Sequence, residues 1–193
     1  MKFNRPALST IIASVSILTL VACSSDDDDD SANGATDSEP ADVVQFDEAI
    51  DGDIVDDPNN PTPVDLVIGQ NRVNASMVAP DLDYLTINVP AGSELTAIEL
   101  TEYTSVDDVS FIGMQTGQNF TETPEDPNPA NLFGFILFGG ALEGGDILEL
   151  MGANPDAQGF TPPLEAGDYS FWIQDTGPDL VTYRLSFVVE ETN

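Results

Sequence analysis

Apolar and polar side chains alternate along several stretches of this chain. In the stretch that begins at Tyr84, the apolar Leu85, Ile87 and Val89 alternate with more polar neighbours. Only a pleated strand sends successive side chains to opposite faces, so this pattern predicts a half-buried β-strand. The other strand candidates, from alternation or from an apolar run, are residues 64–68, 72–77, 94–103, 107–114, 132–138, 169–174 and 183–189.

Turn-forming residues separate these stretches. Pro90-Ala91-Gly92 follows one strand candidate, and residues 121–131 contain three prolines. About eight short strands with such spacing predict an all-β fold, an antiparallel β-sandwich of the jelly-roll or immunoglobulin-like kind. One short helix is expected after Asp146, because that side chain can cap a turn, Glu149 lies three residues later and Gly152 can end the helix.

The beginning of the chain has a different pattern. Lys2 and Arg5 precede an apolar run at residues 7–21. A transmembrane helix needs about 20 apolar residues, so this shorter run is typical of a secretory signal peptide rather than of an uncleaved membrane anchor.

The apolar run ends in Leu20-Val21-Ala22-Cys23, which resembles the lipobox of bacterial lipoproteins. This resemblance implies that residues 1–22 are a signal peptide and that Cys23, the single cysteine, carries palmitate-like acyl chains. Several acyl chains hold a protein on a membrane far more firmly than one does. Ser24 stands where lipoproteins of the inner membrane often have Asp, so the same resemblance favours the outer membrane.

Acidic side chains crowd into the next part of the chain, beginning with Asp26 to Asp30 in a row. High charge of one sign with few large apolar groups predicts a disordered, self-repelling linker over residues 23–60. The β-sandwich domain is then expected at residues 61–193. Asp51-Gly52-Asp53 resembles part of a calcium loop, but the Asp-x-Asp-x-Asp-Gly start and the final Glu of an EF-hand loop are missing, so a solvated spacer is the favoured interpretation.

Composition excludes several function classes. The 193 residues contain 35 acidic and four basic side chains, one cysteine and no histidine, with a formal net charge of −31. Histidine-based catalysis and histidine metal sites are therefore excluded, and one cysteine forms neither an internal disulfide nor a zinc cage. A nucleic-acid partner is excluded because such a charge repels phosphate.

Two stretches resemble one known family. Asp81-Leu82-Asp83-Tyr84, which leads into a strand closed by Val89-Pro90-Ala91-Gly92, resembles the start of the bacterial pre-peptidase C-terminal domain. Residues 163–174, with residues 181–189 after them, resemble its closing pair of strands. The resemblance implies a compact β-sandwich, an accessory module of exported proteins without catalytic residues of its own. This chain departs from the usual context because no enzyme accompanies the domain.

Asp81 and Asp83 are the candidate metal ligands. At positions i and i+2 of a strand they point the same way, and two carboxylates beside a loop carbonyl suit Ca²⁺, which takes six to eight oxygens. The favoured alternative is that both residues mark a turn and start the strand, as Asp commonly does.

Trp172 and Tyr84 are the candidate ligand-binding residues. Trp172 lies on the strand face opposite Phe171 and Ile173. An exposed Trp beside a Tyr provides a platform on which a sugar or a partner protein stacks. The favoured alternative is that residues 133–152 cover Trp172, so that its strand is buried on both sides.

Carboxylate chemistry is the remaining route to catalysis, and it invites a glycosidase with a pair of acids. The adjacent pairs Asp107-Asp108 and Glu125-Asp126 do not have that geometry, because neighbours on a strand point apart and the second pair lies in a loop. The sequence therefore predicts a lipid-anchored, non-catalytic binding or scaffold module with a protein or polysaccharide partner. The alternatives are a calcium-dependent polysaccharide-binding or adhesion protein and, further off, the glycosidase.

Overall fold

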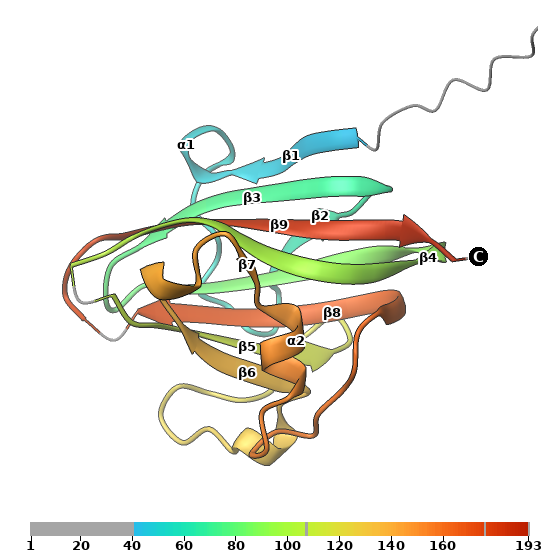
Figure 1. The fold of residues 1–193 in the computed structure, drawn as a ribbon. Helices are drawn as coiled ribbons and strands as arrows, with labels where there is room; N and C mark the ends of the chain where they lie inside the picture. Colours follow the sequence, from blue (N-terminus) through green and yellow to red (C-terminus); the bar gives the residue numbers. More distant parts are fainter. Residues whose placement is uncertain (1–40, 107, 176, 193) are drawn as a thin grey trace, which may run out of the picture. The chain divides into compact units, whose positions relative to one another are not determined.

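The computed structural model describes residues 41–106, 108–175 and 177–192. Nine strands and two short α-helices lie in these residues (Figure 1). In chain order they are β1 (Ala41–Asp47), α1 (Glu48–Asp51), β2 (Thr62–Asp65), β3 (Gly69–Met77), β4 (Leu82–Thr104), β5 (Ser110–Thr116), β6 (Gly134–Phe138), β7 (Gly145–Asp146), α2 (Leu148–Gly152), β8 (Leu164–Asp175) and β9 (Val181–Glu191).

The long strand β4 connects two layers of sheet. Its first half pairs with β8 and β2, its second half pairs with β9 and β7, and the register shifts between Val89 and Glu94. The corner falls at the predicted turn, where Gly92 has a φ of 82° that favours glycine. The strand order is β1-β3-β9-β4-β8-β5-β6, so one continuous path of hydrogen bonds runs through both layers.

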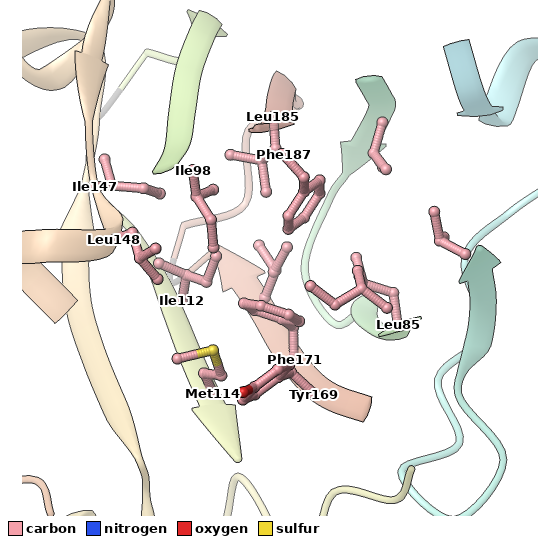
Figure 2. Packing of buried hydrophobic residues seen from close by; sticks show 14 of the residues in the cluster. Leu85, Ile98, Ile112, Met114, Ile147, Leu148, Tyr169, Phe171, Leu185 and Phe187 are labelled. Carbon is pink, nitrogen blue, oxygen red and sulfur yellow. The ribbon is translucent and has the colours of Figure 1, made fainter. Parts of the chain in front are cut away.

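The main hydrophobic core lies between the two layers. Figure 2 shows Leu85 and Phe171 packed close to Ile98 and Phe187, which come from β4 and β9. The rings of Phe171 and Phe187 meet edge to face, with centroids 5.7 Å apart. Each of these four side chains has a relative exposure of 0%. The alternation of apolar and polar residues along the sequence therefore predicted correctly which side chains of these strands point into the core.

The prediction of an all-β sandwich with a short helix is confirmed. α2 ends at Gly152, as expected, and Asp146 Oδ1 accepts the Leu148 N–H at 2.9 Å. The sheet is mixed rather than wholly antiparallel, because β1 pairs with β3, and β2 with β4, in parallel. Each parallel pair includes one strand, β1 or β2, that lies before residue 66 in the chain.

The prediction that residues 23–60 form a disordered linker is wrong for residues 41–60. This part contains β1 and α1, and Ile54 is fully buried in the main core. Its acidic side chains accept backbone hydrogen bonds instead of repelling one another into an open coil. Glu48 accepts the N–H groups of Ile54 and Ser76, and Asp56 accepts that of Leu82. The folded domain therefore begins at least 20 residues earlier than residue 61.

Side chains as well as backbone join β1 to β3. Asp42 forms an ion pair with Arg72 at 2.8 Å. Gln45 Nε2 donates to Asn71 Oδ1 at 2.9 Å, and Asn74 Nδ2 donates to Asp47 Oδ2 at 3.0 Å. This edge strand is thus attached along its whole length.

Candidate functional site

The predicted metal ligands Asp81 and Asp83 lie in different surroundings. Asp83 is completely buried on the inward face of β4, where its Oδ2 accepts the Tyr183 hydroxyl at 2.6 Å. Asp81 precedes the strand and is partly exposed, beside Asp56. In the described residues no three His, Cys, Asp or Glu side chains are grouped to hold a metal ion. The structure does not bring these two carboxylates together as a shared Ca²⁺ site.

The surroundings of both carboxyl groups favour their protonated forms. Burial raises the pKa of Asp83 to about 8, although the Tyr183 hydrogen bond acts in the opposite direction. The pKa of Asp81 is raised to about 6, by burial first and then by the negative charges of Asp53 and Asp56. The second oxygen of Asp83, Oδ1, is buried without a hydrogen-bond partner in the described structure. Only the burial of Asp83 therefore bears on the calcium hypothesis, because a protonated, buried carboxyl is a poor ligand for a hard cation.

The predicted ligand-binding residues Trp172 and Tyr84 are both buried, with relative exposures of 2% and 0%. They stack on each other with ring centroids 6.4 Å apart, and Phe111 lies 4.7 Å from Trp172. An open stacking platform at these rings is therefore wrong. The alternative of a covered Trp holds, but the cover includes Phe120 and Leu132, which lie before the segment expected to provide it.

Three residues of the candidate carboxylate pairs lie in the described structure, all of them in loops. Asp108 accepts the backbone N–H of Gly140 and so fixes a loop, while Asp107 lies outside the described residues. Glu125 and Asp126 are exposed in the loop before β6. Cys23 and the signal peptide also lie outside the described residues.

A groove on the outer face of the first half of β4 is the candidate functional site. Its cavity volume is about 470 Å³, within the usual range for small-ligand sites. We call it the Asp168 groove. Its polar lining includes Asn60, Asp65, Asn88, Gln118, Asn119 and Asp168.

Strand register explains why side chains far apart in sequence meet on the groove floor. Thr86 and Asn88 are the outward residues of the alternating strand, and Asn88 lies directly opposite Asp168 of β8. The walls are residues 55–61 with the strand β2 that follows them, and residues 117–119. They are fastened to each other and to the sheet, because the Phe120 N–H donates to the Pro58 carbonyl and the Gly117 N–H to that of Asp168.

The Asp168 carboxylate accepts hydrogen bonds from two amide side chains of the groove lining. Asn88 Nδ2 donates to Oδ1 at 2.6 Å, and Gln118 Nε2 donates to Oδ2 at 2.9 Å. Thr86 donates its hydroxyl to the Gln118 carbonyl at 2.7 Å, which fixes the adjoining loop. A polar surface whose rotamers are already fixed loses less entropy when a ligand binds.

A second polar hollow adjoins the groove at Asn119, which lines both. Its volume is about 100 Å³, and its lining includes Gln115, Asn131 and the partly buried ring of Phe133. The Gln115 amide is fixed by Thr121 and by the Asn131 carbonyl, to which its Nε2 donates at 3.0 Å. The two hollows together provide a polar surface longer than the groove alone.

Sequence reasoning missed the groove. Asn88 is one of the polar neighbours that alternate with Leu85, Ile87 and Val89, and Asp168 stands within the stretch that resembles a closing strand. The available signal was the set of polar outward residues on two strands that the sandwich prediction already contained. What the sequence does not contain is the pairing of these strands and the two segments that wall the groove.

No family model, curated protein or solved structure matches this chain. In the part of the chain that the structure describes, no helix has both the length and the apolar character to cross a membrane.

Proposed function

We propose that the protein is a non-catalytic binding module of the bacterial cell envelope, anchored by lipid at Cys23 and binding its partner in the Asp168 groove. The observation that carries the binding part is the fixed arrangement of Asn88, Gln118 and Asp168 on the groove floor. The Asp168 oxygens face amide donors, so this carboxylate serves as an acceptor rather than as a proton carrier. That arrangement suits recognition better than acid–base catalysis, which moves a proton in the transition state.

The anchor is supported by the sequence around Cys23. We expect a Cys23→Ala variant to leave the membrane fraction and to lose incorporation of labelled palmitate, because no thiol remains to accept the lipid. Cell fractionation with metabolic labelling measures both. A Cys23→Ala protein that stays with membranes, beside a wild type that takes up no label, would contradict the anchor.

The binding role predicts that the groove retains envelope material. Protein immobilised through its C-terminus is exposed to solubilised envelope polymers, and the bound mass is followed on a microbalance. We expect Asp168→Asn to retain less than half of the wild-type mass, since an Asn at 168 places an amide N–H₂ against one of the two amide donors.

Glu165→Gln is the matched control for that experiment. Glu165 lies on the same strand, is exposed, and is not part of the groove lining, so its substitution removes the same charge without touching the floor. Equal retention by the wild type and both variants would show that the groove is not the binding surface.

A further inference from the structure

We infer that the Asp168 groove binds a neutral, hydroxyl-rich oligosaccharide. This inference rests on the proposed function, because it names the ligand class of the same groove. Three properties of the groove carry it: the balance of hydrogen-bond donors and acceptors, the charge of the lining, and the length of the polar surface.

The floor offers both acceptors and donors in fixed positions. Asn88 and Gln118 each use one amide N–H on Asp168. Each amide therefore keeps a second N–H, and neither amide oxygen accepts a hydrogen bond from the described residues. Asp168 also keeps lone pairs, because a carboxylate has about four acceptor sites. A hydroxyl group both donates and accepts, so neighbouring hydroxyls of a sugar match this alternating set.

The charge and the hydrogen-bonding groups of the lining disfavour anionic and amine-bearing ligands. Asp65 and Asp168 are acidic, and the lining contains no Lys or Arg. The two arginines of the described chain are engaged elsewhere, Arg72 with Asp42 and Arg184 with Glu102. An anionic polymer would therefore meet two like charges and no cation. An ammonium group would be attracted to these carboxylates, but it accepts no hydrogen bond and so would leave the amide N–H groups of the floor unmatched.

The second hollow indicates an extended ligand. It continues the polar surface past Asn119 to Gln115 and Asn131. Phe133 also borders this hollow, but its ring stacks on Phe160 and Tyr169, so the hollow offers amide and hydroxyl groups rather than an open aromatic face. A chain of linked sugar units therefore uses both hollows, whereas a single sugar uses the groove alone.

The test compares three classes of soluble oligosaccharide by titration calorimetry with the mature, lipidated chain in detergent. The probes are neutral gluco-, manno- and galacto-oligomers, the acidic oligomers of galacturonate and alginate, and amine-bearing chitosan oligomers. We expect at least one neutral series to bind with a Kd of about 0.1–1 mM, tightening as the oligomer lengthens. Asp168→Asn and Asn88→Ala should each weaken it at least tenfold, and Glu165→Gln should change it less than twofold. The melting temperature of each variant confirms that it is folded.

Three results would overturn the inference. They are failure of every neutral series to bind, equal or tighter binding of the acidic or amine-bearing series, and unchanged affinity in both groove variants. These outcomes separate the inference from the proposed function. If Asp168→Asn loses envelope material on the microbalance but no neutral series binds, the ligand class is wrong and the binding role stands. If neither the retention of envelope material nor the binding of oligosaccharides depends on Asp168, the binding role of the groove and its ligand class are both wrong.

Discussion

The protein is expected to lose stability as the pH rises from about 4 to about 8. The cause is the buried carboxyl of Asp83, whose pKa is raised to about 8 by burial. An unfolded chain releases this proton near the ordinary value of 3.8. Between these two values the folded protein holds a proton that the unfolded chain has lost, so each rise in pH favours unfolding. One proton corresponds to a slope of about 1.4 kcal/mol per pH unit.

Neighbouring acids reinforce this trend. Glu48 and Asp81 add negative charge near Asp83 and raise its pKa further, whereas the hydrogen bond from the Tyr183 hydroxyl lowers it. The raised pKa of Asp81, about 6, adds a contribution of the same sign at lower pH. Above pH 8 the Asp83 carboxyl is ionised in both states, so its contribution to the slope ends there.

Asp83→Asn should remove most of this pH dependence. The side chain keeps its shape and an oxygen for the Tyr183 hydroxyl but has no proton to lose. We expect the variant to resemble the wild type at pH 4 and to melt at a clearly higher temperature at pH 8. Thermal unfolding at half-unit steps of pH, followed by the emission of the buried Trp172, measures the slope. Asp179→Asn, at an exposed position, should keep the wild-type slope. An unchanged slope in Asp83→Asn would contradict the assignment.

A chain that begins at residue 61 is expected not to fold cooperatively, whereas one that begins at residue 38 should fold. The shorter chain lacks β1 and α1, which leaves one edge of β3 unpaired. It also lacks Ile54, which is fully buried in the main core. Removing a buried Ile side chain alone costs about 2–5 kcal/mol, and a typical domain has only about 5–15 kcal/mol in total.

Two point substitutions test the same segment without shortening the chain. Ile54→Ala should lower the free energy of unfolding by about 2–5 kcal/mol. Ile50→Ala, four residues away at a position that is 82% exposed, should change it by less than about 0.5 kcal/mol. Urea unfolding measures both values. Equal stability of the two variants, together with cooperative unfolding of the chain from residue 61, would restore the linker interpretation of residues 41–60.

The sandwich itself could be predicted because its strands are amphipathic. The inward residues Leu85, Ile87 and Val89 follow the period of two, and all three lie in the main core. The alternation of a strand depends only on its own sequence, so it is visible without knowledge of its neighbours. The two predicted strands that flank Pro90 proved to be halves of one bent strand, which is a small difference.

Residues 41–60 and Trp172 show where sequence reasoning reaches its limit. The charge of Glu48 and Asp56 suggested solvation, but their oxygens accept the backbone N–H groups of Ser76 in β3 and Leu82 in β4. Trp172 has the outward position that alternation predicts, yet Phe120 and Leu132 cover it. In both cases the deciding partner lies far away in sequence, and no local pattern identifies it.

The candidate site was hidden for the same reason. Asn88 and Asp168 are separated by 80 residues, and only the register of β4 against β8 makes them neighbours. The residues that the sequence offered as chemistry, Asp83 and Trp172, instead became part of the packed interior. In this protein the chemically distinctive side chains are buried in the fold, and ordinary amides line the groove.

The parallel pairing of β1 with β3 has a mechanical consequence for a tethered protein. Asp42, Gln45 and Asp47 attach β1 to β3 at successive points, beside the backbone ladder. If the chain is held by its N-terminal side while a ligand pulls on the domain, tension along β1 loads all of these bonds in shear at once. A hairpin pulled from its open end would instead lose its bonds one after another. Under such a load the edge strand would resist the force through all of its bonds together.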